Sequence, residues 1–186
     1  TRLQREHVTS VLLTPSLHSL YLDEIATAMS GLKWVCVAGE ATTLSLVRRH
    51  FERLPGVRLF NEYGPTENSV VTTYTELFPT DTMVSIGRPV AGCQVYVIQP
   101  NGEFCGVGVP GELVTSGVGL ARGYLNQPEL TTAAFGSAPW DAELRIYRTG
   151  DLARWRADGT LEFLGRRDAQ VKLRGYRIEL DEIEEV

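Results

Sequence analysis

The fold class of this chain is predicted most directly from residues 34–64, WVCVAGEATTLSLVRRHFERLPGVRLFNEYG. This stretch begins with a continuous apolar run that ends at Gly39, and it closes with a second short run, VRLFNEYG. The segment between the two runs, LSLVRRHFERL, has apolar residues at helical spacing and stops before Pro55. A strand, a helix and a strand in this order predict a crossover unit with parallel strands.

The residues before this stretch repeat its pattern. SVLLTPS is a short apolar run closed by Pro15, and SLYLDEIATAM has helical spacing. The first third of the chain is therefore predicted to be part of an α/β subdomain with a parallel sheet. Ligands of such sheets bind beyond the carboxyl ends of the strands. NEYGPTENS, residues 61–69, lies at such an end.

The texture changes after Ser69 to short segments rich in β-formers and cut by Gly, Pro and Asn. QPNGEF and RADGTLEF carry Asn-Gly and Asp-Gly turn signals, so this half is predicted to be a mostly antiparallel, barrel-like sheet. A third piece begins near Asp168, with strand-like alternation in QVKLRGYRIEL and a helix start in ELDEIEEV. The predicted domains are residues 1–75 (α/β), 76–167 (β-rich) and 168–186 (the start of a small α+β domain).

Composition narrows the function classes. The chain has 186 residues, 43% of them hydrophobic, which is enough for a buried core. No apolar run approaches 18 residues and TRLQREHVTS lacks the plan of a signal peptide, so we expect no membrane insertion and a cytoplasmic location. The net charge of -5 argues against a nucleic-acid partner. The cysteines and histidines do not fall at metal-ligand spacing.

Two familiar nucleotide signatures do not apply. GVGVPG, residues 106–111, satisfies the GxGxxG pattern, but it follows a hairpin signal, contains a proline and leads into a strand rather than a helix. The Walker pattern GxxxxGK[ST] is absent from the sequence. Any nucleotide must therefore be bound by another kind of motif.

NEYGPTENS contains residues that can form such a nucleotide-binding motif. Gly64 and Pro65 fix a turn that exposes backbone amides, Thr66 offers a hydroxyl to a phosphate, and Glu67 offers an oxygen ligand suited to Mg²⁺. Tyr63 can lie flat against a base. The alternative is an ordinary Gly-Pro turn with a solvated glutamate.

YRTGDLARWRADGTLEFLGRRD, residues 147–168, favours the nucleotide. Asp151 follows a Thr-Gly turn and can accept from both hydroxyls of a ribose, while Arg166 can donate to the sugar or to a phosphate. The alternative is a hairpin with surface salt bridges, which applies above all to Arg154, Arg156 and Arg167.

Four motifs, in this order, resemble those of the adenylate-forming enzymes, most closely the adenylation domains of nonribosomal peptide synthetases. They are NEYGPTE, GELVTSGVGLARGYLNQPELTTAAF, YRTGDLARWRADGTLEFLGRRD and QVKLRGYRIELDEIE. The resemblance covers nearly the whole chain. It implies activation of an amino acid with ATP and Mg²⁺, giving an aminoacyl adenylate. Transfer to the phosphopantetheine thiol of a carrier protein follows, so the implied partners are a peptidyl carrier domain and other synthetase modules.

The resemblance also implies residue roles. Tyr63 stacks on adenine beside the Gly64 turn, Thr66 contacts the phosphate, Glu67 binds Mg²⁺, and Asp151 and Arg166 hold the ribose. Asp168 matches the hinge about which a small C-terminal lid rotates, and Lys172 lies in a loop that shapes the thioester-forming state. The positions that match the amino-acid side-chain pocket are Leu13, Cys36, Ala38, Glu62, Val70 and Val71.

Most of these pocket positions are apolar. A carboxylate at Glu62 is costly in such a wall unless it is paired, which favours a substrate whose side chain donates a hydrogen bond. We therefore expect a polar-tipped aromatic substrate, tyrosine or histidine.

The sequence departs from the family pattern in what it omits. It contains no Ser/Thr/Gly-rich phosphate loop with its lysine, no segment supplying the acid for the substrate's amino group, and no match to the lid's catalytic lysine. We expect that these 186 residues alone do not turn over. Two alternatives are an acyl-CoA ligase of the same superfamily and a truncated, non-catalytic nucleotide-binding module.

Overall fold

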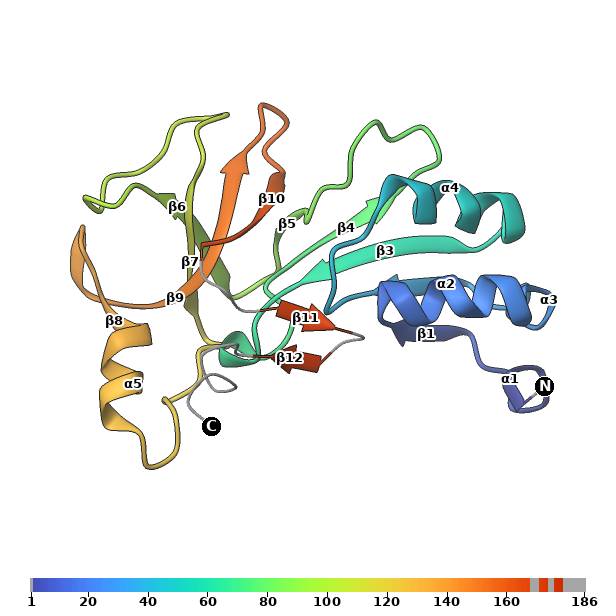
Figure 1. Ribbon diagram of the computed structural model, residues 1–186, viewed down its shortest axis with the longest axis horizontal. Helices are drawn as coiled ribbons and strands as arrows, with labels where there is room; N and C mark the ends of the chain where they lie inside the picture. The colour runs from blue at the N-terminus through green and yellow to red at the C-terminus, as the bar shows by residue number, and fades with distance from the viewer. Residues whose placement is uncertain (1, 168–170, 174–175, 179–186) are drawn as a thin grey trace. The chain divides into compact units, whose positions relative to one another are not determined.

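The computed structural model describes residues 2–167, 171–173 and 176–178 (Figure 1). Two compact units form within the chain. The first contains Thr1–Glu62 and Thr75–Val84, and the second contains Tyr63–Tyr74 and Ser85–Ala169. The boundary between the two units therefore falls within NEYGPTENS, after Glu62.

The first unit alternates short helices and strands. Its elements are α1 Arg2–Arg5, β1 Ser10–Leu13, α2 Pro15–Glu24, α3 Ala26–Met29, β2 Trp34–Val37, α4 Leu44–Arg53, β3 Arg58–Tyr63 and the later part of β4 Thr73–Leu77. β1, β2 and β3 pair in parallel, with Leu12 opposite Cys36 and Cys36 opposite Phe60. The parallel α/β arrangement predicted from the crossover pattern is confirmed.

Threonine caps begin the two longer helices. Thr14 Oγ1 accepts from the backbone N–H of Leu17 at 3.3 Å, and Thr43 Oγ1 accepts from that of Leu46 at 3.3 Å. Each such cap is worth about 1 kcal/mol. In Figure 1, α2 and α4 run alongside the strands, and the core between them is built from buried side chains such as Leu22, Val35 and Leu59.

The segment with helical spacing at residues 19–29 forms two helices rather than one. Ile25 leaves the helical conformation, with φ −135° and ψ 21°, and its backbone N–H closes α2 by donating to the Tyr21 carbonyl at 2.9 Å. The Ile25 side chain packs against the core of the first unit. Periodicity marks the buried face but not the break in the backbone.

The second unit is built on an antiparallel sheet with strand order β10-β9-β7-β6, and β8 also pairs with β9. The strands are β6 Cys93–Ile98, β7 Gly111–Gly117, β8 Phe135–Ala138, β9 Asp141–Trp155 and β10 Leu161–Arg166; a short β5, Arg88–Pro89, pairs with the start of β4. The predicted Asp-Gly turn joins β9 to β10, with Gly159 at φ +76°. This confirms the β-rich half of the predicted fold class.

Two features of the second unit are not in the sequence prediction. Helix α5, Pro128–Ala134, interrupts a stretch predicted to contain only strands and turns. The Asn-Gly turn at residues 101–102 forms, but beyond it only an isolated bridge joins Ile98 to Phe104. Local turn signals therefore locate the reversal of the chain but not the length of the strand that follows.

β11, Val171–Leu173, and β12, Tyr176–Ile178, form an antiparallel hairpin, with Lys172 opposite Arg177. Asp168 and the helix start predicted at residues 179–186 lie outside the described residues. None of the helices in the described part of the chain is long and apolar enough to cross a membrane.

Candidate functional site

The loop that follows β3 folds back on itself around Gly64. The backbone N–H of Thr72 donates to the Tyr63 carbonyl at 2.8 Å, and that of Val70 donates to the Pro65 carbonyl at 3.1 Å. A Cβ at Gly64 would lie 2.3 Å from the Val70 carbonyl oxygen and 2.7 Å from the Thr72 nitrogen. Only glycine permits this approach of two backbone segments.

The same loop holds two residues in the left-handed region. Ser69 has φ +55° and Val70 has φ +72°. Positive φ is unusual for a β-branched residue, and such conformations cluster at functional sites. The Val70 side chain is 53% exposed, so burial of valine does not explain its conformation.

Tyr63, Asp151 and Arg166 form one hydrogen-bonded cluster. The Tyr63 hydroxyl donates to Asp151 Oδ2, and Arg166 Nη1 donates to Asp151 Oδ1 at 2.9 Å. Asp151 is buried, at 6% exposure, and its own N–H donates to Thr149 Oγ1 at 3.0 Å. Residues far apart in the sequence thus fix a buried carboxylate between a phenol and a guanidinium.

Burial raises the pKa of the Tyr63 phenol well above its ordinary value, and the charge of Asp151 raises it further. Tyr63 is therefore a neutral hydrogen-bond donor at physiological pH. Each oxygen of a carboxylate can accept more than one hydrogen bond, which makes Asp151 the type of group that binds ligand hydroxyls.

Phe163 lies beside Tyr63 and was not singled out from the sequence. The two ring centroids are 6.1 Å apart, with planes inclined by 39°. Both rings pack against the hydrophobic cluster that contains the buried Leu161. The one signal in the sequence was the alternation of Leu161 and Phe163 along β10, which did not by itself separate a core residue from a site residue.

Thr66 and Glu67 lie in a single 3-10 turn, Thr66–Asn68, directly after the Gly-Pro step. Thr66 is exposed, whereas Glu67 is only 5% exposed. The Tyr124 hydroxyl donates to Glu67 Oε1 at 2.6 Å. Sequence reasoning did not find Tyr124, because nothing local pairs it with a glutamate 57 residues away.

Asn68 anchors this turn from below. It is fully buried, and its Nδ2 donates to Thr72 Oγ1 at 3.0 Å and to Thr115 Oγ1 at 2.6 Å. These bonds tie the turn to β7. The position of Glu67 is thereby set by its neighbours and not by the loop alone.

Glu67 is better suited to a metal that binds together with a ligand than to a permanently bound ion. In the described part of the chain, no group of three or more His, Cys, Asp and Glu side chains could hold a metal. Mg²⁺ is commonly bound by one or two carboxylates together with substrate phosphates and water. A single carboxylate held next to an exposed Thr66 hydroxyl suits that mode.

Four of the predicted pocket positions belong to the first unit. The Ala38 N–H donates to the Leu13 carbonyl at 3.0 Å, which brings the ends of β1 and β2 together. Burial raises the pKa of the Cys36 thiol, and a hydrogen bond with Glu62 and the charge of that carboxylate raise it further. Leu13, Cys36, Ala38 and Glu62 thus gather at the carboxyl ends of β1, β2 and β3.

The other two pocket positions, Val70 and Val71, belong to the second unit. Lys172 lies in β11. Asp168, the predicted hinge, is outside the described residues.

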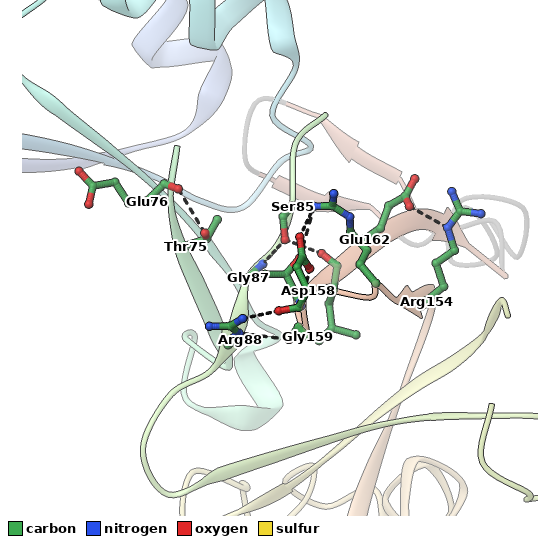
Figure 2. A network of polar contacts seen from close by, with 12 residues as sticks. Thr75, Glu76, Ser85, Gly87, Arg88, Arg154, Asp158, Gly159 and Glu162 are labelled. Atoms are coloured by element: carbon green, nitrogen blue, oxygen red, sulfur yellow. Dashed lines mark hydrogen bonds and ion pairs between the residues drawn. The ribbon is translucent and has the colours of Figure 1, made fainter. Parts of the chain in front are cut away.

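The remaining arginines of the β9–β10 hairpin form the salt bridges that the alternative interpretation predicts. Arg154 pairs with Glu162 at 2.7 Å, as Figure 2 shows, and Arg156 pairs with Asp158 at 3.1 Å. Figure 2 also shows Arg88 donating to the backbone carbonyls of Asp158 and Gly159. These contacts stabilise the turn and leave Asp151 and Arg166 as the residues with a separate, buried arrangement.

Known proteins share both the sequence and the fold. The family described as AMP-binding enzyme matches residues 1–125. Bacitracin synthase 3 of Bacillus licheniformis is 52% identical over 182 residues, which is 98% of this chain and 3% of that protein. The chain belongs to the AMP-binding enzyme family, and it spans only a small part of this relative.

Solved structures agree. Holo-PA1221, described as an NRPS protein containing adenylation and PCP domains bound to a vinylsulfonamide inhibitor, is 36% identical with a TM-score of 0.91, over 98% of this chain and 33% of that chain. The NRPS FmoA3 in its α-methyl-L-serine-AMP bound form is 30% identical with a TM-score of 0.83, over 90% of this chain and 20% of that chain.

Proposed function

We propose that this chain is part of an amino-acid-activating adenylation domain of a nonribosomal peptide synthetase. The observation that carries the proposal is the buried Asp151 carboxylate, held by Tyr63 and Arg166 in the same compact unit as Glu67. Further support comes from its similarity to an NRPS protein with adenylation and PCP domains and to an NRPS with a bound aminoacyl-AMP.

The proposed reaction has two steps. A carboxylate oxygen of the amino acid attacks the α-phosphorus of ATP, the bond to the β-phosphate oxygen breaks, and pyrophosphate leaves. A carrier-protein phosphopantetheine thiol then attacks the acyl carbon, losing its proton, and AMP leaves with the bonding electrons. Both steps depend on positioning and on neutralising charge rather than on a covalent enzyme intermediate.

Different side chains of the second unit are proposed to bind the base, the ribose and the phosphates of the nucleotide. The ring of Tyr63, with Phe163 beside it, provides an aromatic surface for adenine, and base–aromatic stacking is worth about 1–3 kcal/mol per base. Asp151 accepts from the ribose hydroxyls, with Arg166 donating nearby. The exposed Thr66 hydroxyl donates to a phosphate oxygen, next to the turn that Gly64 makes feasible.

Glu67 is the proposed ligand of Mg²⁺. When bound, the metal neutralises charge on the phosphates. The contribution of this chain is to hold the Glu67 carboxylate in one position next to Thr66. Lys172 is the proposed contributor to the second step, from β11.

The proposed substrate is an amino acid with a polar-tipped aromatic side chain, tyrosine or histidine. Glu62 carries this proposal, because its carboxylate stands among the apolar positions Leu13, Cys36 and Ala38, where a hydrogen-bond donor on the substrate would add to the weak thiol donor of Cys36. The resemblance also assigns Val70 and Val71, which belong to the second unit, to the amino-acid side chain.

The proposed domain organisation is an α/β part at 1–75, a β-rich part at 76–167 and the start of a lid at 168–186, with Asp168 as its hinge. The proposed partners are a peptidyl carrier domain and other synthetase modules, in the cytoplasm, with no role for nucleic acid or membrane. Since the sequence contains no phosphate loop with its lysine, we propose that the chain acts only as part of a complete domain.

Amino-acid-dependent ATP–pyrophosphate exchange by the complete adenylation domain that carries this chain tests the proposal. We expect exchange with tyrosine or histidine and none with simple carboxylic acids. Exchange with aliphatic amino acids alone would overturn the substrate class. Exchange with non-amino acids alone would identify an acyl-CoA ligase, and absence of both exchange and ATP binding would leave a non-catalytic module. The isolated 186 residues should form no adenylate.

A further inference from the structure

The hydrogen bond between Tyr124 and Glu67 joins a half-buried tyrosine to a buried carboxylate within the second unit. Tyr124 Oη lies 2.6 Å from Glu67 Oε1, and Glu67 is 5% exposed. A carboxylate buried to this degree needs donors to hold its charge. The phenol of Tyr124 is a neutral donor, so the bond orients the carboxylate without cancelling its charge.

The position of Tyr124 is itself fixed. Its backbone N–H donates to Thr131 Oγ1 at 2.8 Å, and its ring meets that of Phe135 edge-on, with centroids 5.7 Å apart. Gly123 has φ +145°, and a Cβ there would lie 2.5 Å from Thr131 Cγ2. The hydroxyl is therefore delivered from a rigid support.

The segment before Tyr124 is tied to the turn that carries Glu67. The Ala121 N–H donates to the Glu67 carbonyl at 2.8 Å, and Ser69 Oγ donates to the Gly119 carbonyl at 2.7 Å. Arg145 holds the same segment by donating to the Ala121 carbonyl at 2.7 Å. Backbone and side chain of Glu67 are thus both held by residues 119–124.

Asp151, the other carboxylate of the candidate site, likewise accepts from a tyrosine hydroxyl, that of Tyr63. A tyrosine hydroxyl thus fixes the orientation of a carboxylate at both places. Partners that orient a metal ligand typically contribute 10-fold to 100-fold in metal affinity.

We propose that Tyr124 is a positioning residue that holds the Glu67 carboxylate in place as a ligand of the metal–nucleotide substrate. The inference rests on the proposed function of Glu67. It adds a residue outside NEYGPTENS to the machinery of the first reaction step.

The test uses Tyr124→Phe in the complete adenylation domain, which removes only the hydroxyl. Tyr96→Phe is the matched control, because the Tyr96 hydroxyl donates to the neutral side chain of Gln94 at 2.8 Å in the same unit. Glu67→Gln removes the proposed ligand itself. Binding of Mn²⁺ in the presence of the non-hydrolysable ATP analogue α,β-methylene-ATP is measured by electron paramagnetic resonance, and pyrophosphate exchange is measured as a function of Mg²⁺ concentration.

We expect Tyr124→Phe to weaken Mn²⁺ binding about tenfold and to raise the Mg²⁺ concentration for half-maximal exchange by a similar factor. The rate at saturating Mg²⁺ should fall much less, and Tyr96→Phe should match the wild type. If Glu67→Gln weakens Mn²⁺ binding and Tyr124→Phe does not, the inference is overturned while the proposed function stands. If Glu67→Gln also binds Mn²⁺ normally, the metal role of Glu67 fails first. If Tyr124→Phe weakens nucleotide binding without metal as much as it weakens Mn²⁺ binding, and also lowers the melting temperature, its role is structural and the inference is overturned.

Discussion

The two compact units bury different kinds of polar group. Among the residues that the structure describes, the first unit buries the histidines His18 and His50, and the second buries the carboxylates of Glu67, Glu112 and Asp151. Neutral groups are cheaper to bury than charged ones, so the buried histidines cost the first unit less than buried charges would. Buried ionisable groups with specific partners are candidates for functional sites, and the buried carboxylates named here lie in the second unit.

The histidine pair shows how a polar group is buried without charge. His50 Nε2 donates to the Val57 carbonyl at 2.7 Å, so its Nδ1 accepts from His18 Nε2 at 3.0 Å. Burial lowers the pKa of His18 to about 4, and the neighbouring His50 contributes to the same shift. Burial also lowers the pKa of His50. The pair joins α2 to α4 as two neutral rings.

Burial of a carboxylate is not enough to assign chemistry to it. Glu112 is as buried as Glu67, but it pairs with Arg148 at 2.8 Å and with Arg167 at 3.6 Å across the sheet. Glu67 and Asp151 differ from it because each receives a tyrosine hydroxyl. Glu112 therefore has the contacts of a structural ion pair, whereas Glu67 and Asp151 are the carboxylates that we propose to bind the metal and the nucleotide.

The largest expected effect comes from Glu67→Gln, which removes the proposed metal ligand from the second unit. We expect pyrophosphate exchange by the complete domain to fall by about 10²-fold to 10³-fold, since a group that stabilises developing charge is removed. Glu112→Gln is the matched control and should lower the melting temperature while exchange stays within a few-fold of the wild type. Equal losses of exchange in both variants would contradict the division between the two carboxylates.

The next effect is the acid sensitivity of the first unit. The unfolded chain protonates His18 near its ordinary pKa of 6.5, whereas the folded protein resists protonation down to about 4. This contribution to stability is complete above pH 6.5 and is lost as the pH falls towards 4, by about 3 kcal/mol. Urea unfolding between pH 7 and pH 4 should show it. His18→Gln keeps a donor for His50 but does not titrate, so its pH dependence should be flatter; an unchanged slope would remove the histidine pair from the account.

A smaller effect should come from the strained loop of the second unit. Val70 has φ +72° and is 53% exposed, and asparagine tolerates positive φ better than a β-branched residue. We expect Val70→Asn to raise the free energy of unfolding by about 1 kcal/mol. Val107→Asn, at an exposed site without positive φ, is the control. A gain in both variants would mean that the effect is one of surface polarity and not of backbone strain.

The smallest effects should be alike in both units. Arg58–Glu76 in the first unit and Arg154–Glu162 in the second are surface pairs, each with its guanidinium at 2.7 Å from the carboxylate. Double-mutant cycles should give about 0.5 kcal/mol for either pair. A coupling of several kcal/mol in one unit would show that surface charge, and not buried charge, distinguishes the units.

Patterns with a fixed period carried most of the fold. Alternation of strands and helices in residues 10–63 predicted the parallel sheet, and the Asp-Gly turn predicted the β9–β10 hairpin. Helix α5 was missed because PELTTAA is short and lacks a clear apolar stripe. Secondary-structure propensity and periodicity are local properties. They therefore predict neither the break in the helix at Ile25 nor the contact of the Ile25 side chain with the core.

The site was predicted where motifs are contiguous and missed where contacts are distant. Tyr63, Glu67, Asp151 and Arg166 stand in recognisable stretches of sequence. Tyr124 also lies in a quoted motif, GELVTSGVGLARGYLNQPELTTAAF, but its contact with the site becomes visible only as a hydrogen bond across 57 residues. Side-chain contacts of this kind depend on the fold as a whole, which one sequence does not specify pair by pair.

The buried Asp151 is proposed to bind the ribose hydroxyls of the nucleotide, and a binding measurement can test this role. Binding of a non-hydrolysable aminoacyl-adenylate analogue to the complete domain is measured by calorimetry for wild type, Asp151→Asn and Asp158→Asn. Asp158 lies on the same hairpin but is exposed, where it accepts from Thr160 and pairs with Arg156. The account predicts affinity about 100-fold weaker for Asp151→Asn, as expected for lost hydrogen bonds to a charged group, and unchanged affinity for Asp158→Asn. Wild-type affinity in a folded Asp151→Asn variant would contradict it.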